Sequence, residues 1–385
     1  MKKITVVELF AGVGGFRLGL ERANKNAFDF VFVNQWEPNE KMQHAFNCYV
    51  NNFGNENAIN ENIVDAKNKI PNNPDLIVGG FPCQDYSVAA TNAKGIEGKK
   101  GVLWWEISWI IENKNPRFLL LENVDRLLKS PSSLRGRDFA IMLIRLHKLG
   151  YNAEWQVINA ADYGMVQRRR RIFIFIWKQS ESKYKKSIFE KHFKSTPKIE
   201  PVEFDLIDEY PNEIDASNNY KKGKFLNKGT FINGIVRMYD YNPVFNGKKK
   251  ILNDVLLENF DKKYFLSNEQ IEKMKYLKGK KSIERIRPNG EKYFYTEGSM
   301  SFYDDINKQA RTIITSETSM NRSTHIIKVK NKYRFITPIE AERINGFPDN
   351  WTETIASEKK RYFCMGNALV IEIIERLAKS IIDLF

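Results

Sequence analysis

Short runs of apolar residues recur through the first half of the chain and alternate with segments of helical periodicity. The run Ile4–Phe10 is followed by a glycine-rich turn and by the helical pattern Phe16–Ala23. Further strand-like runs occur at Phe28–Val33, Asp75–Val78, Arg117–Leu121, Trp155–Asn159 and Ile172–Trp177. This alternation is typical of an α/β fold in which helices cover a largely parallel sheet. The continuously apolar stretch Phe118–Leu121 indicates a strand that is buried on both faces.

The composition indicates a soluble globular protein with a polyanionic partner. The 385 residues include 61 Lys and Arg against 47 Asp and Glu, for a formal net charge of +14. No apolar run is long enough to span a bilayer, so we expect a cytoplasmic protein. Nucleic acid is the commonest polyanionic partner, although a basic surface without a specific partner explains the charge equally well. The three cysteines form no CxxC pair and the four histidines lack ligand spacing, so we predict no metal site.

The character of the sequence changes after Trp177. Residues 178–310 are rich in Lys, Asn, Tyr and Phe and contain turn signals such as Asn233-Gly234. We predict a basic, loop-rich domain at 181–310, between a first domain at 1–180 and a return to that domain at 311–385. The segment Ala368–Leu384 has the apolar stripe of an amphipathic helix, which requires a hydrophobic partner. The sheet of the first domain is the expected partner.

Two segments of the first half have the features of a nucleoside site. Phe10–Gly15 forms a glycine-rich turn between a strand and a helix, and Asn34–Glu37 ends the second strand with polar and aromatic side chains. Glycines allow the backbone to approach a ligand, a carboxylate holds ribose hydroxyls and an aromatic ring stacks on a base. The turn is not a full G-x-G-x-x-G, and a purely structural role is about equally common.

The segment Gly79–Gln84 presents Cys83 at the end of a buried strand. An arbitrary cysteine is more often a small core residue than a nucleophile. The polar residues that follow, Gln84–Ser87, favour a position at a surface opening. A nucleophilic thiol also needs electropositive surroundings, which the arginine run in Gln167–Arg171 is able to provide. Glu122 ends a neighbouring strand and is a candidate acid or anchoring group at the same sheet edge.

These segments, in this order, resemble the DNA cytosine-C5 methyltransferase family of bacterial and phage restriction–modification systems. The resemblance covers residues 1–177 and 311–385. The blocks that carry it are Phe10–Gly15, Pro82-Cys83-Gln84, Glu122-Asn123-Val124, Gln167-x-Arg169-x-Arg171, Arg311-Thr312-Ile313, Gly346-Phe347-Pro348 and Gly366-Asn367. The Asp/Ser/Asn-Pro-Pro-Tyr/Phe motif of exocyclic-amine methyltransferases is missing, which favours methylation of C5 over that of N4 or N6.

The resemblance implies a Rossmann-like S-adenosylmethionine-dependent methyltransferase sheet with helices on both faces, plus a smaller loop-rich target-recognition domain. It also implies attack of Cys83 on C6 of a cytosine that is flipped out of the duplex, followed by methyl transfer to C5. Family roles in catalysis fall on Cys83, Glu122, Asn123, Arg169 and Arg171. Family roles in cofactor binding fall on Phe10, Gly12, Gly14, Gly15, Trp36, Glu37, Asp65, Gly80, Phe81, Pro82, Leu103, Asn367 and Leu369.

One position departs from the family pattern. Many relatives have a ribose-binding Glu directly before the residue that corresponds to Trp36, and this chain has Gln35 there. Either Gln35 or Glu37 therefore holds the ribose. The stretch Gln84–Val102 is similar to the family's mobile loop, which closes over flipped DNA. The implied partners are double-stranded DNA and, functionally, a cognate restriction endonuclease, and the family default is a monomer.

Three other functions compete with DNA methylation. A tRNA cytosine-C5 methyltransferase belongs to the same family, although a basic insert of this size suits a duplex DNA site better. A DNA-binding relative without activity is a second alternative, and the intact Cys83, Glu122 and Arg169 speak against it. A Rossmann-type oxidoreductase is favoured only if the glycine-rich turn is considered alone.

Overall fold

The computed structural model describes residues 2–38, 40–81, 103–181, 184, 186–287 and 289–385. It divides into two compact units. The first unit contains Met1–Tyr163, Arg170–Gly247 and Ile371–Phe385, and the second contains Gly164–Arg169 and Lys248–Val370. Of the predicted features, Pro82, Cys83 and the loop Gln84–Val102 lie outside the described residues.

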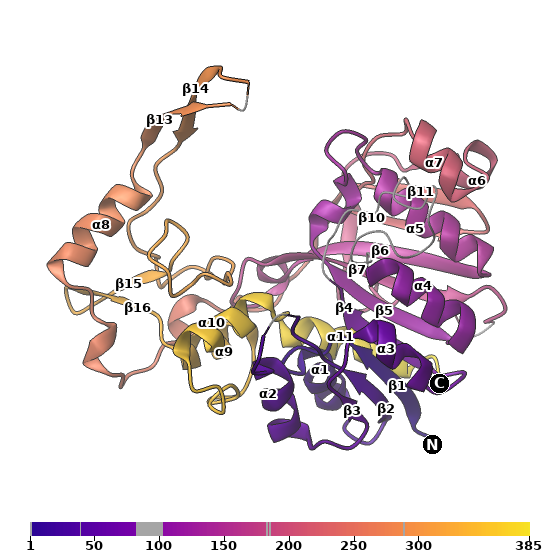
Figure 1. The fold of residues 1–385 in the computed structure, drawn as a ribbon, viewed down its shortest axis with the longest axis horizontal. Helices are drawn as coiled ribbons and strands as arrows, with labels where there is room; N and C mark the ends of the chain where they lie inside the picture. Colours follow the sequence, from indigo (N-terminus) through magenta and orange to yellow (C-terminus); the bar gives the residue numbers. More distant parts are fainter. Residues whose placement is uncertain (1, 39, 82–102, 182–183, 185, 288) are drawn as a thin grey trace. The chain divides into compact units, whose positions relative to one another are not determined.

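The first unit is built on a ten-stranded sheet whose first half is parallel (Figure 1). The parallel strands lie in the order β3-β2-β1-β4-β5. They are β1 (Ile4–Leu9), β2 (Phe28–Asn34), β3 (Ala58–Ile59), β4 (Leu76–Gly80) and β5 (Phe118–Asn123). The chain moves outward from β1 to β3 and then returns to the other side of β1. Strands β1 and β4 therefore flank the topological switch point, where open α/β sheets bind their ligands.

The second half of the sheet is antiparallel. Its order is β7-β6-β10-β11-β9, and β7 pairs with β5. These strands are β6 (Tyr151–Asn159), β7 (Arg170–Lys178), β9 (Val202–Asp205), β10 (Lys228–Ile232) and β11 (Ile235–Tyr239), and a separate two-stranded sheet joins β8 (Ser195–Pro197) to β12 (Tyr241–Pro243). Strands β10, β11 and β9 extend the sheet of the first unit beyond residue 180, as far as β11, and the unit includes Arg170–Gly247. Pairing of β10 with β6 joins residues far apart in sequence, so local periodicity does not reveal it.

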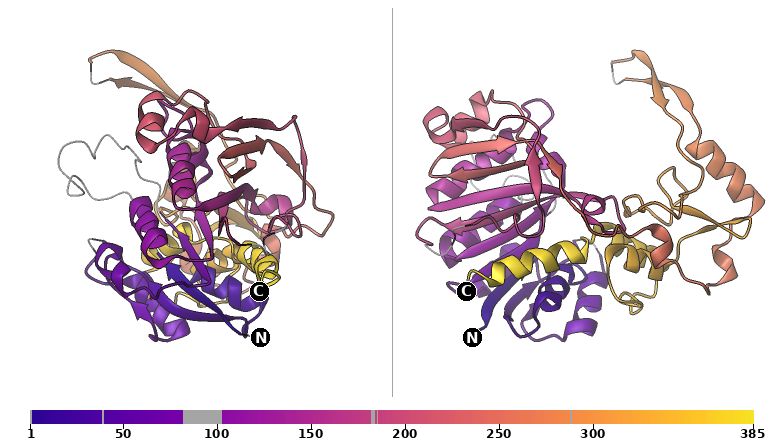
Figure 2. Two further views of the ribbon diagram at one scale, coloured as in Figure 1. Left: turned by 90° about the vertical axis from the view of Figure 1, so that its right-hand side faces the viewer. Right: turned by 180° about the vertical axis from the view of Figure 1, so that it is seen from behind.

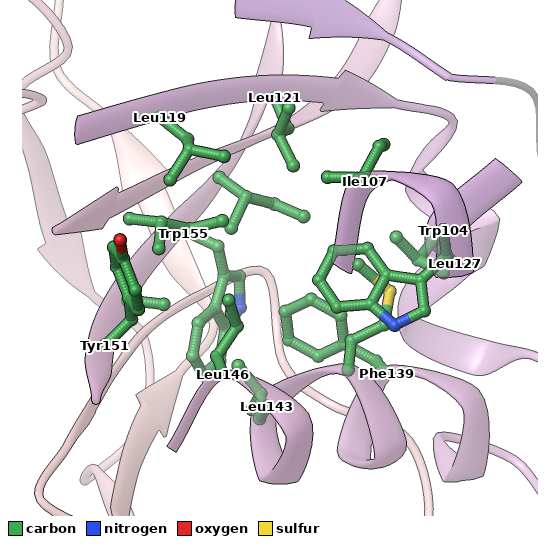
Figure 3. Packing of buried hydrophobic residues seen from close by; sticks show 14 of the residues in the cluster. Trp104, Ile107, Leu119, Leu121, Leu127, Phe139, Leu143, Leu146, Tyr151 and Trp155 are labelled. Atoms are coloured by element: carbon green, nitrogen blue, oxygen red, sulfur yellow. The ribbon is translucent and has the colours of Figure 1, made fainter. Parts of the chain in front are cut away.

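Helices cover both faces of the sheet, as predicted. On one face, α4 (Leu103–Lys114) and α5 (Arg137–Lys148) bury Trp104 and Phe139 against Leu119 and Leu121 of β5 (Figure 3). Side chains alternate along a strand, and Phe118 accordingly lies on the opposite face, 5.5 Å from the ring of Phe385.

The predicted C-terminal amphipathic helix is α11 (Ile371–Ile382), which packs on α1 (Gly15–Ala23) (Figure 2). A Cβ added at Gly19 would lie 2.5 Å from Cβ of Ile374, so the glycine allows this close approach. The remaining helices of the first unit are α2 (His44–Phe53), α3 (Ile63–Ala66), α6 (Leu206–Glu209) and α7 (Glu213–Asn219). No helix in the described part of the chain is long and apolar enough to cross a membrane.

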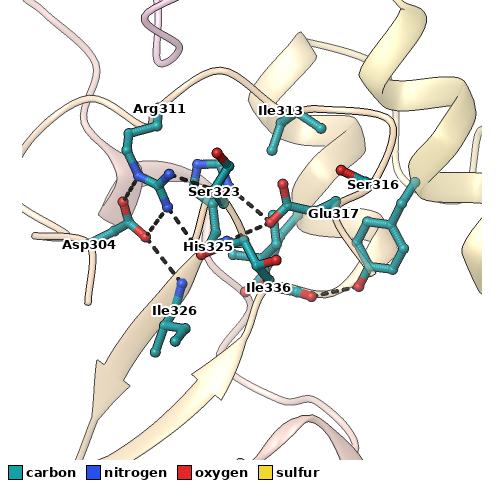
Figure 4. A network of polar contacts seen from close by, with 12 residues as sticks. Asp304, Arg311, Ile313, Ser316, Glu317, Ser323, His325, Ile326 and Ile336 are labelled. Carbon is teal, nitrogen blue, oxygen red and sulfur yellow. Dashed lines mark hydrogen bonds and ion pairs between the residues drawn. The ribbon is translucent and has the colours of Figure 1, made fainter. Parts of the chain in front are cut away.

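The second unit contains three α-helices and two hairpins among its described residues. These elements are α8 (Asn268–Lys278), β13 (Lys281–Ile286), β14 (Lys292–Glu297), β15 (Ile326–Val329), β16 (Lys332–Phe335), α9 (Pro338–Asn345) and α10 (Glu358–Asn367). Two polar pairs in this unit are shielded from water: Arg311 binds Asp304 at 2.6 Å, and Nδ1 of His325 lies 3.0 Å from Glu317 (Figure 4). Pairing offsets the cost of removing such groups from water. Nζ of the buried Lys278, by contrast, has no hydrogen-bond partner among the described residues.

Candidate functional site

The glycine-rich turn follows β1 at the switch point of the sheet. Gly12 has a φ of +57°, and a Cβ added there would meet no atom of the described residues within 4 Å. Gly14 has a φ of +86°, and its Cβ would lie 2.3 Å from the ring of Phe53. Gly14 is therefore required by packing, whereas Gly12 leaves open space beside the backbone. A ligand that approaches the main chain at this turn has room at Gly12.

The end of β2 lies next to this turn. Oε1 of Gln35 accepts a hydrogen bond of 2.7 Å from the backbone N–H of Gly12. Trp36 is 40% exposed, so its ring is open to a stacking partner. Oε2 of Glu37 accepts from the backbone N–H of Ala45, in the first turn of α2, at 2.8 Å. Gln35 and Glu37 both have structural hydrogen bonds, and the geometry does not single out one of them as a ribose ligand.

A buried carboxyl group lies beneath the turn. Glu8 of β1 accepts from the hydroxyl of Tyr49 at 3.1 Å and from the backbone N–H of Arg17 at 3.3 Å. Burial raises the pKa of Glu8 to about 8, although the hydrogen bond from Tyr49 and the charge of Arg17 oppose this effect. Desolvation likewise raises the pKa of Tyr49. The contact with Arg17 ties the strand to the first turn of α1.

Glu122 and Arg171 form an ion pair at the end of β5. Nε of Arg171 lies 2.9 Å from Oε1 of Glu122, and the side chains are 19% and 14% exposed. The pair forms because β7 begins beside the carboxyl end of β5 in the antiparallel pairing. A Cβ added at Gly80 would lie 3.0 Å from Oε2 of Glu122, so the missing side chain makes room for the carboxylate. The arrangement holds a carboxylate and a guanidinium at one sheet edge.

Asn123 connects this pair to the segment that precedes Cys83. Its Nδ2 donates a buried hydrogen bond of 2.9 Å to the carbonyl of Phe81, and its Oδ1 accepts from the N–H of Val124 at 2.8 Å. The position of the backbone two residues before Cys83 is thereby fixed to the residue that follows Glu122. The predicted nucleophile itself lies outside the described residues.

The model of the C-5 cytosine-specific DNA methylase family matches residues 4–383. The chain belongs to this family. It is 49% identical, over 99% of its own length and 96% of the relative's, to the type II methyltransferase M.Sau3AI of Staphylococcus aureus. The chain is therefore a DNA cytosine-5 methyltransferase with relatives among the type II methyltransferases.

Solved structures with low sequence identity share the fold. A DNMT2 mutant of Spodoptera frugiperda has a TM-score of 0.62 at 14% identity and covers 98% of both chains. The Dnmt2 methyltransferase of S. pombe has a TM-score of 0.61 at 15% identity and covers 97% of both chains. The expected methyltransferase-type α/β architecture is thus confirmed.

In this DNA methylase, several predicted cofactor residues meet at the carboxyl edge of β1, β2 and β4 in the first unit. These are Phe10, Gly12, Gly14, Gly15, Trp36, Glu37 and Gly80. Phe10 adopts a φ of +55°, which is unusual for a residue with a Cβ and continues the tight turn. Phe81 is 3% exposed and its ring packs 6.3 Å from that of Trp104, so the side chain contributes to the core.

The other predicted cofactor residues have different surroundings. Asp65 is exposed on α3, and half-buried Leu103 begins α4 and packs at the margin of the core. Asn367 and Leu369 belong to the second unit, where Asn367 is exposed and Leu369 is buried. The side chains of Leu103 and Leu369 are apolar, and those of Asp65 and Asn367 make no hydrogen bond to another described residue. Their roles remain those implied by the family resemblance.

The two predicted catalytic arginines have different surroundings. Arg169 is 2% exposed and donates to the carbonyls of Ile313 at 3.1 Å and Gly366 at 2.9 Å, all within the second unit. Gln167 donates to Oδ1 of Asn345 at 2.7 Å and accepts from the N–H of Ile313. Gln167 and Arg169 are therefore hydrogen-bonded to Ile313 and Gly366, which belong to two other blocks of the family resemblance. The role of Arg169 toward the cytosine stays the one implied by the family resemblance.

Sequence reasoning did not identify one residue of this region, Glu8, or the hydrogen bond between Gly12 and Gln35. Glu8 was passed over as part of a strand, although a carboxylate inside the apolar run Val6–Leu9 is itself a signal of a special role. The hydrogen bond from Gly12 to Gln35 was also missed. No sequence pattern predicts it, because it depends on the register of β1 with β2.

Proposed function

We propose that this methyltransferase modifies C5 of cytosine at a short specific sequence in duplex DNA, with Cys83 as the nucleophile and S-adenosylmethionine as the methyl donor. The Glu122–Arg171 pair, at 2.9 Å, is the observation that carries the proposal. A carboxylate and a guanidinium at the carboxyl edge of the sheet match the charge that develops on a cytosine ring during attack at C6. Asn123, which holds the carbonyl of Phe81, supports delivery of Cys83 to the same edge.

The residues divide the reaction between them. The Cys83 thiolate forms a bond to C6, and the electron pair of the C5–C6 double bond becomes available at C5. Glu122 stabilises the ring by binding or protonating N3, and Arg171 binds O2 while it orients Glu122. After C5 has taken the methyl group, loss of the C5 proton and expulsion of the Cys83 thiolate restore the aromatic ring. The target atom is inaccessible in a duplex, so the base must be flipped out.

The turn at Gly12 fits a nucleoside cofactor. Open space beside Gly12 and the exposed ring of Trp36 lie at the topological switch point, where a backbone cradle and a stacking surface are needed. S-adenosylmethionine supplies an electrophilic methyl group when bound. The residues of this chain would position the cofactor. Phe10, Gly12 and Gly80 would shape the backbone around it, and Gln35 or Glu37 would hold its ribose. Arg169, whose guanidinium donates to the carbonyls of Ile313 and Gly366, keeps the catalytic role that the family resemblance implies.

We further propose that the second unit provides target recognition. It contains residues 248–310 of the segment 181–310 that was predicted for this role, while residues 181–247 belong to the first unit. Because the relatives are type II methyltransferases, we propose that the enzyme belongs to a bacterial or phage restriction–modification system in the cytosol. We also propose that it acts as a monomer and has a cognate endonuclease as its functional partner.

Bisulfite sequencing tests the proposed reaction. Plasmid DNA is recovered from a methylation-free host that expresses the wild type or Cys83→Ala. Protected cytosines at one short motif, present with the wild type alone, are expected. The matched control is Cys364→Ala, which removes a thiol from the second unit and should leave protection intact. Soluble wild-type protein that binds S-adenosylmethionine but protects no cytosine in DNA would contradict the proposal, and protection of cytosine in tRNA instead would establish the RNA alternative.

A further inference from the structure

Strands β13 and β14 form a hairpin that pairs with no third strand among the described residues of the second unit. The antiparallel register places Ile283 opposite Tyr295 and Arg285 opposite Tyr293. Figure 1 shows the hairpin extending beyond the end of α8. A two-stranded hairpin alone is marginally stable in water. Its two faces, which bury little within the chain, are therefore available to a partner.

The base of the hairpin is anchored to its own unit. Nζ of Lys281 lies 3.5 Å from Glu297, where the two strands meet. Arg322 binds Glu297 at 2.8 Å and donates to the carbonyl of Gly298 at 2.7 Å. The N–H of Met300 donates to the carbonyl of Lys278 at 2.9 Å. These contacts orient the ribbon before any partner binds, which lowers the entropic cost of binding.

The two faces of the hairpin carry different side chains. Because side chains alternate along a strand, one face presents Lys281, Ile283, Arg285, Tyr293, Tyr295 and Glu297. The other face presents Ser282, Glu284, Ile286, Lys292, Phe294 and Thr296. Ile286 and Phe294 are each 66% exposed, so the second face is not covered by the second unit.

Arg285 differs from the other cations of the hairpin. Lys292 lies 2.7 Å from Glu284, and Arg287 lies 2.6 Å from Glu291. Lys281 is paired with Glu297 as described above. Arg285 is exposed and contacts no carboxylate within the described part of the chain, so its charge is the one that the hairpin leaves uncompensated. Its guanidinium lies 4.0 Å from the ring centroid of Tyr295, a cation–π distance that restrains the side chain.

We propose that the β13–β14 hairpin enters the major groove of the DNA substrate and that Arg285 reads a guanine of the methylated sequence. A two-stranded ribbon fits the major groove, which is about 12 Å wide. Arginine in a bidentate pair with N7 and O6 of guanine is the commonest specific contact. The net charge of +14 attracts the protein to DNA in general. The uncompensated guanidinium of Arg285 adds a local positive charge that is complementary to the acceptor atoms of guanine. This inference rests on the proposed function and deepens it.

The stacking on Tyr295 restrains the guanidinium of Arg285 before it meets a base. A guanidinium that lies against a ring has fewer rotamers to lose when it binds. Lys292, on the opposite face, already has Glu284 as its partner and is expected to contact phosphates at most. Arg285 and Lys292 therefore have separable roles. Arg285 selects the sequence, and Lys292 contributes to the general attraction to DNA.

The test compares full-length wild type with Arg285→Ala, Arg285→Lys and the control Lys292→Ala. Each protein methylates a library in which every position of the wild-type motif is varied, and bisulfite sequencing gives the relative rates. For both Arg285 variants, the preference for guanine at one position should fall by roughly 5- to 150-fold. Lys292→Ala should keep the preference and lower the rate on all sequences alike.

The outcomes separate this inference from the proposed function. Wild-type protein that methylates no DNA contradicts the proposed function itself. Wild-type methylation with unchanged base preference in both Arg285 variants overturns the hairpin assignment alone. Full preference in Arg285→Lys with loss in Arg285→Ala also overturns it, because lysine keeps the charge but lacks the bidentate fork. Melting temperatures equal to that of the wild type are expected for all three variants, since the substituted residues are exposed.

Discussion

Nε of Arg171 lies 2.9 Å from Oε1 of Glu122 at the point where β7 begins beside the end of β5. The pair is partly shielded from water and joins a guanidinium to the proposed acid of the reaction. A second ion pair nearby, Arg170 with Asp125 at 3.1 Å, is more exposed, at 49% and 32%. Neighbouring arginines of one strand thus make two pairs with different degrees of burial, and these can be tested against each other.

Replacing Glu122 with Gln removes the charge and preserves the size of the side chain. We expect kcat to fall by roughly 10²- to 10⁴-fold, the usual contribution of a general acid or base. Single-turnover methylation measures the change. The control Asp125→Asn breaks the exposed pair, which typically contributes under about 1 kcal/mol, and its rate should stay near that of the wild type. Equal losses in the two variants would contradict the catalytic role of Glu122.

Replacing Asn123 with Ala leaves the buried carbonyl of Phe81 without its donor. We expect the free energy of unfolding to fall by about 1–3 kcal/mol, the cost of an unsatisfied buried polar group. We also expect kcat to fall, because the segment before Cys83 loses its anchor. Urea denaturation and methylation rates measure the two effects. Asn113→Ala, which removes an exposed hydrogen bond within α4, should change neither. A stable Asn123→Ala variant would argue against the anchor.

Alanine at Gly14 and at Gly12 should have different effects. Both positions have positive φ, so each substitution introduces backbone strain of about 1–2 kcal/mol. At Gly14 the new methyl group also meets Phe53, and we expect a much larger loss of stability. At Gly12 it projects into open space that we assign to the cofactor, and affinity for S-adenosylmethionine should fall by about tenfold or more. Calorimetric titration measures the affinity for S-adenosylmethionine, and thermal melting measures the stability of each variant. Unchanged affinity in Gly12→Ala would contradict the placement of the cofactor at this turn.

The buried carboxyl of Glu8 predicts a pH dependence of stability. Its pKa in the folded protein is raised to about 8 by burial, from 4.5. The folded state therefore holds a proton that the unfolded state has lost between these values. The contribution to stability is complete below pH 4.5 and is lost as the pH rises to about 8, at no more than about 1.4 kcal/mol per pH unit.

Glu8→Gln tests this contribution, because glutamine resembles the protonated acid and is able to accept the same hydrogen bonds. Urea denaturation of both proteins from pH 5 to pH 8.5 provides the measurement. We expect similar stability at the lower end and a more stable variant at the upper end. Parallel pH profiles for the two proteins would mean that Glu8 does not titrate in this range.

Local patterns predicted four of the five strands of the parallel half, and the two-residue strand β3 was not among them. Continuous apolar runs such as Phe118–Leu121 mark strands covered on both faces, and Gly150 marks the end of α5, where its φ is +79°. The amphipathic stripe of α11 also identified a helix that needs a partner. In each case the information lies within a window of a few residues, so pairing partners are not required to recognise it.

The boundaries of the units and the roles of the arginines were harder to predict. Residues after Trp177 look irregular in sequence, yet β10 pairs with β6 and extends the sheet of the first unit. The run at Gln167–Arg171 looks uniform, yet Arg169 is buried against two carbonyls and Arg171 binds Glu122. Both outcomes depend on contacts between residues distant in the chain.

The order of residue types along the chain was sufficient to specify the α/β class and the family, because these follow from local periodicity and from blocks of adjacent residues. Only the tertiary structure decided which arginine meets Glu122, that Asn123 holds the carbonyl of Phe81, and that Glu8 is buried beneath the glycine-rich turn. The reason is physical: strand register and burial set these distances and the pKa of Glu8, and neither is a property of any short segment.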